Sequence, residues 1–334
     1  MINKIGGMSV NVLFIHRKQV YAAFWVMIIL TILVGVKLNW DHTVRKIFGV
    51  KTGVYLEGYS VEGMLPEEVS SLVKKMAVKV NREPQNAGYF SETGEIIPAK
   101  PGRMVMVADT VNRVCMAKPG SKLNLVVAEV PAKISEDFFK PIYHGKPETG
   151  RVAFAINVAW GEEFLTEMLK TLEQEKVKAT FFFVGSWVKA FPELVKEIAA
   201  AGHEIANHGL YHGHPQQMRR DELKKLILEN TELLRSVIGK EPSNLFAPPY
   251  GEINTEIVAT AGELGYRTVM WSVDTIDWKN PGPDLLLQRV LGKIEPGGII
   301  LMHPTVSTMK ALPRLIKGLR EKGLSPGTVS SVLE

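Results

Sequence analysis

The chain is poor in cysteine, with Cys115 alone among its 334 residues. A single thiol excludes a disulfide within the chain, and it excludes a zinc site built on several cysteines. Long runs of one charge are also missing. The 40 basic residues exceed the 35 acidic ones by five, but they are dispersed and are not striped with aromatic residues. Nucleic acid is therefore not an expected partner.

One long run without charge occurs near the amino terminus, at residues 19–36, QVYAAFWVMIILTILVGV. About 20 such residues cross a bilayer as a helix, so the run predicts a transmembrane segment. A core helix would show polar residues at a helical period, and this run shows none. A cleaved signal peptide would need a pair of small residues before Lys37, and the run is long for that role. The prediction is an uncleaved signal anchor.

The charges around this run do not orient it, because basic residues flank both sides. They are Lys4, Arg17 and Lys18 before the run, and Lys37, Arg45, Lys46 and Lys51 after it. A short leader before a single span usually stays in the cytoplasm. We therefore expect residues 1–40 to be a cytoplasmic leader and membrane anchor. The protein would be single-pass in the cell membrane, with the bulk of the chain extracellular.

Residues 50–135 predict a small α+β domain without catalytic chemistry, since they hold no histidine and no cluster of carboxylates. A helix is expected from Pro66, with acidic residues in its first turn. Short strands are expected at residues 88–90, 95–97, 104–107 and 123–130. The run GVYLEGYSVEGMLPEEV and the region that follows resemble peptidoglycan-binding modules of exported bacterial proteins. A spacer without a ligand is the alternative.

Residues 148–334, after an expected linker at 135–147, alternate between strand and helix patterns. Strands are expected at 151–158, 179–184, 203–207, 245–247, 268–272 and 298–302, and helices at 162–175, 192–201, 221–238, 255–264 and 284–293. Such alternation implies parallel strands covered by helices, as a barrel or as a doubly wound sheet. In both, chemistry sits at the carboxyl ends of the strands.

The stretch GHEIANHGLYHGHP, residues 202–215, holds four of the eight histidines. His208 and His212 are four residues apart, a spacing that can turn two imidazoles toward one metal ion. A polar surface loop that happens to be rich in histidine is the alternative. The same edge of the predicted sheet collects other polar residues that follow strands: Asn157, Asp274, Asp277 and His303.

The order of motifs in this segment resembles the polysaccharide deacetylases of the NodB-homology type, carbohydrate esterase family 4. The matching stretches are KATFFFVGSWV, HGLYH, FAPPYG, VMWSVDTIDW and IILMHPT. The resemblance implies an α/β fold, a deformed (β/α) barrel of NodB-homology type over residues 148–334. A transmembrane helix and the small α+β domain would precede it.

The resemblance also implies a function: metal-assisted hydrolysis of N-acetyl groups on a cell-wall glycan such as peptidoglycan. A divalent metal, zinc in most members, would be held by His208 and His212. His303 would be the general acid for the leaving amine, and Asp277 would orient it. The residues expected to line the substrate groove are Leu301, Trp278, Pro249 and Tyr250.

Three positions depart from the family pattern. Asn157 stands where the base aspartate is expected, Val158 at the metal-binding aspartate and Ala247 at the arginine. An amide cannot accept a proton near neutral pH, and valine has no ligand atom. Loss of the base carboxylate also leaves an arginine without its partner, so the three changes are mutually consistent. The prediction is a catalytically impaired member, a pseudoenzyme, with the metal site incomplete.

Other readings stay open at this point. Glu162, Glu163, His203 and His214 are candidates to replace a missing group. Two glutamates also suit a helix start, which is the alternative for that pair. A non-catalytic protein that binds glycan or assists envelope assembly would use the old cleft as a groove. An intracellular, metal-independent enzyme on the same fold is a third reading.

Overall fold

The computed structural model describes residues 17–90 and 92–334, apart from the side chain of residue 38. By its contacts the chain divides into two compact units. One comprises residues up to 83 together with 102–130, and the other comprises 84–101 together with 131–334. The expectations for the leader, including Lys4, fall on residues 1–16 and lie outside the described residues.

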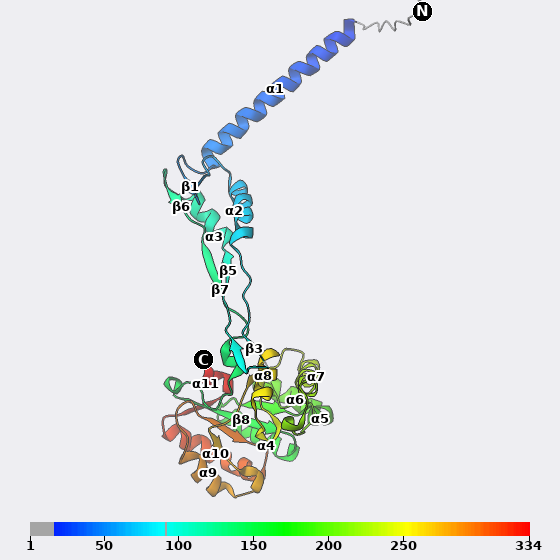
Figure 1. Ribbon diagram of the computed structural model, residues 1–334, viewed down its shortest axis with the longest axis vertical. Helices are drawn as coiled ribbons and strands as arrows, with labels where there is room; N and C mark the ends of the chain where they lie inside the picture. Colours follow the sequence, from blue (N-terminus) through cyan, green and yellow to red (C-terminus); the bar gives the residue numbers. More distant parts are fainter. Residues whose placement is uncertain (1–16, 91) are drawn as a thin grey trace, which may run out of the picture. The chain divides into compact units, whose positions relative to one another are not determined.

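The first unit begins with the helix α1 (Arg17–Phe48), which continues past the predicted apolar run (Figure 1). Among the described residues it is the one helix long and apolar enough to cross a membrane, a property that spans share with signal sequences. An ion pair joins the last turn of this helix to the helix that begins at Pro66. The Arg45 guanidinium donates to both Glu68 carboxylate oxygens at 2.6 and 2.7 Å, and this hydrogen bond is the main cause that lowers the pKa of Glu68 to about 2.

The rest of this unit packs two helices, α2 (Pro66–Val80) and α3 (Val107–Cys115), against short strands. The strands form two sheets: β1 (Tyr55–Leu56) with β2 (Tyr59–Ser60) and β6 (Lys122–Leu123), and β5 (Gly102–Val105) with β7 (Val127–Val130). The prediction of a single strand at 123–130 is therefore wrong, since β6 and β7 are separate strands. Its middle leaves the sheets because the Leu125 amide donates to the Glu57 carboxylate and the Val126 amide donates to the Thr110 hydroxyl.

The second unit is built on an eight-stranded sheet, apart from the hairpin β3 (Gly88–Phe90) with β4 (Glu95–Ile97). The sheet runs in the order β12-β11-β10-β9-β8-β14-β13, and β15 pairs with β8 beside this path. Its strands are β8 (Arg151–Val158), β9 (Thr180–Phe183), β10 (Glu204–Asn207), β11 (Leu245–Phe246), β12 (Arg267–Thr268), β13 (Val273–Asp274), β14 (Ile299–Met302) and β15 (Ser325–Gly327). Each pairs in parallel with its neighbours. The two end strands, β12 and β13, do not pair with each other, so the sheet is a half-barrel.

The alternation of side chains along β8 separates two cores. Val152, Phe154, Ile156 and Val158 join the large apolar cluster that the sheet forms with its helices. Ala153 and Ala155 join the smaller cluster on the opposite, inner face. Because side chains alternate with a period of two, Asn157 shares the inner face with these alanines, whereas Val158 faces the helices.

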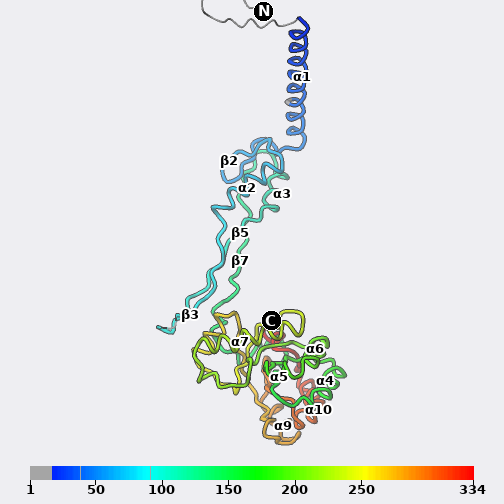
Figure 2. Tube along the Cα trace, turned by 90° about the vertical axis from the view of Figure 1, so that its right-hand side faces the viewer, coloured from blue at the N-terminus to red at the C-terminus, as the bar shows by residue number. Residues whose placement is uncertain are grey.

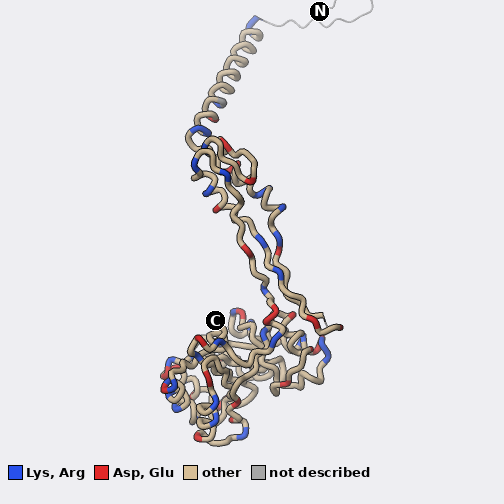
Figure 3. Tube along the Cα trace, turned by 60° about the vertical axis from the view of Figure 1, so that its left-hand side comes forward, with Lys and Arg blue, Asp and Glu red and all other residues tan. Residues whose placement is uncertain are grey.

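Helices cover the outer face of this sheet. They are α4 (Glu162–Gln174), α5 (Gly185–Ala190), α6 (Pro192–Ala200), α7 (Arg220–Ile238), α8 (Thr255–Glu263), α9 (Pro283–Leu291) and α10 (Val306–Glu321). The helix α11 (Val329–Leu333) packs on the inner face of β8, where Val329 and Val332 join Ala153 and Ala155. Figure 2 shows α4, α5, α6 and α10 grouped together in the C-terminal unit. Acidic and basic residues are interspersed along this unit (Figure 3).

Two expectations for this region differ from the structure. The predicted strand at 268–272 is replaced by β12 and β13, because the chain leaves one edge of the half-barrel after Thr268 and joins the other edge at Val273. The segment at 135–147 is also more ordered than a linker. It contains the 3₁₀ helix η1 (Glu136–Phe139), which packs against α8, and Ile142 bridges to Val269.

Candidate active site

The parallel register gathers the predicted site residues at one edge of the half-barrel. Val158, Phe183 and Asn207 pair in one row across β8, β9 and β10, and Phe246 extends that row on β11. His208 and Ala247 each follow the last residue of their strand, and His303 follows Met302 in the same way. The carboxyl ends of the strands therefore carry His208 and His303, with His212 four residues further along the chain from His208.

An amide network positions the two histidines of the HGLYH motif. Asn207 is fully buried, and its side-chain amide donates to the Ile227 carbonyl and to the Thr231 hydroxyl, both at 2.8 Å. Its carbonyl oxygen accepts from the amide of Gly209 at 2.7 Å. Gly209 has a φ of +86°, a conformation that favours glycine. This turn carries the chain from His208 to His212.

His208 is buried, and its Nδ1 lies 2.7 Å from the carbonyl oxygen of Ala247. A carbonyl can only accept, so Nδ1 carries the proton and Nε2 is the nitrogen free for a ligand. Burial lowers the pKa of His208 to about 3, and the neighbouring imidazoles of His212 and His303 act in the same direction. Burial also lowers the pKa of His212. The lowered pKa values of His208 and His212 favour the neutral form of both rings, the form that binds metal.

The ring centroids of His208 and His212 lie 5.3 Å apart with the planes at 70°. Two imidazoles that bind one ion at about 2.0–2.1 Å would hold their centroids at a similar separation. The pair can therefore supply two ligands. The third is missing: Val158 has no ligand atom and its side chain is fully buried in the outer apolar cluster. The residues present do not fit a catalytic zinc site, which takes three protein ligands.

The candidate replacements do not complete this set. Within the part of the chain that the structure describes, no group of three or more His, Cys, Asp or Glu side chains lies close enough to hold a metal ion. Glu163 is exposed and Glu162 is partly buried, both in the first turn of α4. His203 lies at the other end of β10, where its Nδ1 accepts from the Ala179 amide at 3.2 Å.

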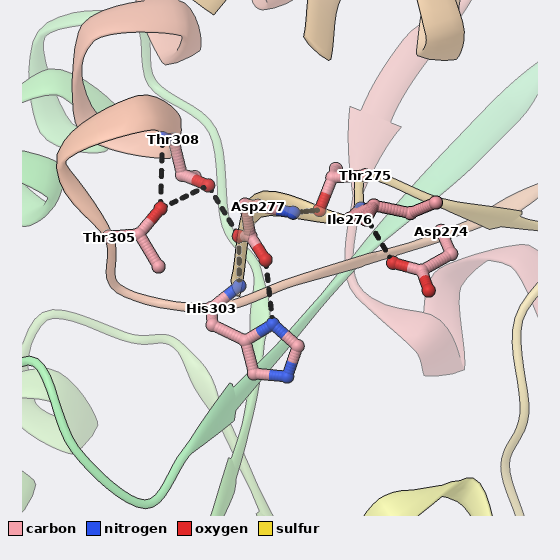
Figure 4. A network of polar contacts seen from close by, with 7 residues as sticks. All are labelled: Asp274, Thr275, Ile276, Asp277, His303, Thr305 and Thr308. Atoms are coloured by element: carbon pink, nitrogen blue, oxygen red, sulfur yellow. Dashed lines mark hydrogen bonds and ion pairs between the residues drawn. The ribbon is translucent and has the colours of Figure 1, made fainter. Parts of the chain in front are cut away.

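Asp277 and His303, the pair expected to supply the general acid, lie in hydrogen-bonding contact (Figure 4). Asp277 is fully buried, and its carboxylate accepts three hydrogen bonds: from the His303 amide at 2.6 Å, from His303 Nδ1 at 2.8 Å and from the Thr308 hydroxyl at 2.5 Å. A carboxylate accepts, so Nδ1 of His303 holds the proton and Nε2 points away from Asp277. The Thr308 hydroxyl also accepts from Thr305 at 3.2 Å. Nε2 is thus the nitrogen that can transfer a proton.

The backbone before Asp277 is strained. Ile276 has a φ of +54°, rare for a β-branched residue, and its amide donates to the Asp274 carboxylate at 2.8 Å. Tyr250 is another position with a left-handed backbone at this edge, with a φ of +59°. Strain of this kind concentrates at functional sites, because the surrounding structure has to hold it.

Asn157 is buried at the predicted base position, and its side-chain oxygen has no hydrogen-bond partner among the described residues. It is on the inner face of β8, the face of the sheet that also carries Leu301, which pairs with Ala155. An amide oxygen here can orient a water molecule or a substrate group, but it cannot remove a proton.

The predicted groove residues separate into a floor and a rim. Leu301 and Pro249 are buried. Tyr250 and Trp278 are 57% and 51% exposed. The Tyr250 ring meets His212 edge-on at 4.3 Å and stacks flat on His214, also at 4.3 Å. His214 in turn contacts the Glu252 carboxylate at 2.7 Å, so it supports Tyr250 instead of joining the metal pair.

Sequence reasoning missed one residue of this edge, Trp160. Its indole stacks on the His303 ring at 5.1 Å and 15°, and it meets His212 edge-on at 6.3 Å. The neighbouring Gly161, with a φ of +83°, permits this approach, because a Cβ there would lie 2.0 Å from the carbonyl oxygen of Pro304. The available signal was an aromatic residue two positions after β8, at the edge where the polar residues gather.

Comparison with known proteins agrees with this geometry. The sequence profile described as polysaccharide deacetylase matches residues 144–269. The uncharacterized protein YlxY of Bacillus subtilis is 37% identical over 254 residues, which cover 75% of this chain and 79% of that protein. A peptidoglycan-N-acetylglucosamine deacetylase of Bacillus cereus is 35% identical over 197 residues, covering 58% of this chain and 71% of that enzyme.

Solved structures similar to this chain include a pseudoenzyme. The crystal structure of BA3943, a CE4 family pseudoenzyme from Bacillus anthracis, matches with a TM-score of 0.58 and 35% identity, covering 80% of this chain and 95% of that one. A mutant of BA3943 with restored enzymatic activity matches with the same TM-score at 34% identity. This chain belongs to the polysaccharide deacetylase family, carbohydrate esterase family 4. It is a homologue of peptidoglycan deacetylases, and its structural neighbours include pseudoenzymes, which is consistent with impaired catalysis.

Proposed function

We propose that this chain recognises N-acetylated cell-wall glycan at the carboxyl edge of its half-barrel but hydrolyses the acetyl group poorly or not at all. The observation that carries the proposal is the contrast between two halves of one site. The Asp277–His303 pair is fully hydrogen-bonded, whereas Val158 is an apolar side chain in the core at the place of a metal ligand.

The residues present can perform the later part of acetyl hydrolysis. His303, held by Asp277 through Nδ1, keeps Nε2 available and can donate a proton from it to a leaving amine. Asn157 can orient a group but cannot act as the base, a loss typically worth about 10²–10⁴ in rate. Family members are generally metal-dependent, and we propose that zinc at His208 and His212 binds weakly because two imidazoles are its only ligands here.

A second candidate is glycan binding or envelope assembly without any chemistry. The rim of the site favours it, since Trp160, Tyr211, Tyr250 and Trp278 are all partly exposed aromatic residues near one edge. Aromatic rings give apolar contact area to the faces of sugar rings at little conformational cost. The first unit adds a groove of about 460 Å³ lined by Tyr59, Lys75 and Lys79, which supports a proposed peptidoglycan-binding module over residues 50–135.

We propose that α1 anchors the chain as a single span, with residues 1–40 as cytoplasmic leader and anchor and with the bulk of the chain, including a deacetylase domain over 148–334, outside the cell. The length and composition of α1 support this. An alkaline phosphatase reporter fused to the carboxyl end is expected to be active. An inactive phosphatase, with an active cytoplasmic reporter at the same position, would reverse the orientation and favour the intracellular reading.

Co-sedimentation of the full-length protein with insoluble peptidoglycan tests recognition and hydrolysis together. We expect the protein to sediment with the polymer and to release no more acetate than a His303→Ala variant does. Failure to sediment would remove both candidate functions. Sedimentation of a Tyr250→Ala and Trp278→Ala double variant at the wild-type level would place the binding outside the half-barrel edge.

A further inference from the structure

A pocket lies at the opposite end of the half-barrel from His208, His212 and His303. It has a volume of about 320 Å³ and is lined by the segment before β8, by Arg267 and by Leu333. Arg267 is the first residue of β12, so this pocket is at the amino ends of parallel strands. It shares no residue with the candidate active site.

Arg267 is the unusual member of this pocket. Its side chain is partly buried, and its Nε atom is fully buried without a hydrogen-bond partner. Among the described residues its guanidinium forms no ion pair either. Burial lowers the pKa of Arg267, and Asp137 acts in the opposite direction. The Nε atom is out of a ligand's reach, but the terminal N–H groups of this guanidinium form no hydrogen bond with the described residues, and since Arg267 lines the pocket they suit a ligand that supplies an acceptor.

The other charged groups around the pocket leave it net basic. Lys140 and Lys146 line it together with the single acidic residue Asp137. Lys140 contacts Asp137 at 3.5 Å, and both side chains are largely exposed. Lys146 donates to the backbone oxygen of Glu334 at 2.6 Å. Neither contact satisfies Arg267.

Backbone hydrogen bonds hold the wall of this pocket in place. The amide of Ile142 donates to Thr268 at 2.8 Å, and the Met270 amide donates back to Ile142 at 2.7 Å. The Gly145 amide donates to Gly297 at 2.7 Å. A Cβ on Gly145 would lie 2.3 Å from the carbonyl oxygen of Val332, so the wall packs tightly on α11. The pocket is therefore formed before any ligand arrives.

We propose that this pocket is an oxyanion site, in which Arg267 binds a phosphate or carboxylate group with Lys140 and Lys146 at its mouth. A planar guanidinium with free N–H groups binds either group with two parallel hydrogen bonds. A phosphodiester polymer would present the first group, and the free carboxylates of a peptide would present the second. The site would hold the half-barrel to an anionic polymer independently of the histidine edge.

Binding of inorganic phosphate and of acetate to the full-length protein in detergent tests this proposal, with affinities measured by NMR titration of each probe. Arg267→Gln is expected to weaken binding about tenfold or more, because a charge-assisted pair is lost. Arg289→Gln is the matched control. Arg289 on α9 is also partly buried with an unpartnered Nε, but it does not line the pocket.

The binding results distinguish the two sources of the oxyanion. Tighter binding of phosphate, and of poly(glycerol phosphate) over polyglutamate, assigns the phosphodiester source; the reverse assigns the carboxylate source. No binding of either probe, or equal binding by Arg267→Gln and Arg289→Gln, overturns the proposal. If Arg267→Gln does not fold, as judged by thermal unfolding, the exposed pair Lys140→Gln and Lys146→Gln is measured instead. That double variant is expected to lose several-fold in affinity, and unchanged affinity overturns the proposal.

Discussion

The indole of Trp160 lies flat against the imidazole of His303, with ring centroids 5.1 Å apart and planes inclined by 15°. The two residues follow neighbouring strands, β8 and β14. Trp160 also meets His212 edge-on, so one aromatic side chain contacts a histidine of the acid half and a histidine of the metal half. It is 42% exposed and forms part of the rim that a glycan would meet.

Replacing this indole should weaken glycan binding. Trp160→Ala removes the stack on His303 and part of the rim, and an aromatic pair is worth about 0.5–1.5 kcal/mol beyond its buried area. We expect a several-fold loss of affinity for N-acetylglucosamine oligomers, measured by isothermal titration calorimetry. Tyr143→Ala is the control, since Tyr143 is equally exposed but lines the pocket at the other end of the strands. Equal losses in both variants would contradict a role for Trp160.

The buried carboxylate of Asp277 should be essential for the fold of this edge. Asp277→Asn leaves three donors facing an amide that can accept fewer bonds and brings two donors of its own, at a cost of about 2–4 kcal/mol. Chemical denaturation measures the difference. Asp274→Asn is the matched control, because Asp274 accepts one backbone amide, from Ile276, and is only partly buried. A loss no larger than that of the control would show that the network carries little stability.

A carboxylate at position 158 should make stability depend on metal. In Val158→Asp the new carboxylate is desolvated in the outer apolar cluster, so the metal-free variant is expected to be less stable than wild type. Zinc binds the folded state alone, and about 2.7 kcal/mol is regained at 100 times its dissociation constant. Thermal unfolding with zinc and with a chelator measures both effects.

Val152→Asp is the control for that zinc response. Val152 faces the same apolar cluster as Val158 but lies at the amino end of β8. It should be destabilised to a similar degree and should not be rescued by zinc. Rescue of both variants, or of neither, would contradict the assignment of position 158 to the metal site.

Because of His203, the free energy of unfolding should decrease in mild acid. Burial lowers its pKa to about 4, from an unfolded value near 6.5. Its neutral form contributes stability above pH 6.5, and that contribution is lost as the pH falls from 6.5 toward 4, by at most about 1.4 kcal/mol per pH unit. His203→Asn keeps an acceptor for the Ala179 amide and should reduce this loss. Denaturation at pH 7.5 and 5.0 checks it, and identical slopes in both proteins would contradict it.

The alternation of strands and helices predicted parallel strands covered by helices, because a buried parallel strand is an apolar run. The choice of a deformed barrel over a doubly wound sheet came from the resemblance to the deacetylases. Register then brought Asn157, His208, Asp277 and His303 to one edge, as parallel strands require. Side-chain stacking could not be predicted in this way. Trp160 and His303 are far apart in sequence, and nothing local to either indicates that their rings meet. The same holds for His214, whose ring supports Tyr250 through a contact between two loops.

The predictions of two continuous strands, at 268–272 and at 123–130, also failed. The continuous strand expected at 268–272 became two, because tertiary pairing at the two edges of the half-barrel overrides local propensity. At 123–130, side-chain acceptors from Glu57 and Thr110 took amides that a strand would have used. Both errors arise from long-range hydrogen bonds, which a local pattern of apolar residues does not encode.

The most direct test of the central claim, an intact acid half beside a missing base and metal ligand, is acetate release from N-acetylglucosamine oligomers with added zinc. Wild type is expected to match His303→Ala, whereas the double variant Asn157→Asp with Val158→Asp is expected to exceed both by about 10²-fold or more. In the triple variant that also carries His303→Ala, the gain should disappear. Acetate release by wild type well above that of His303→Ala would contradict the account.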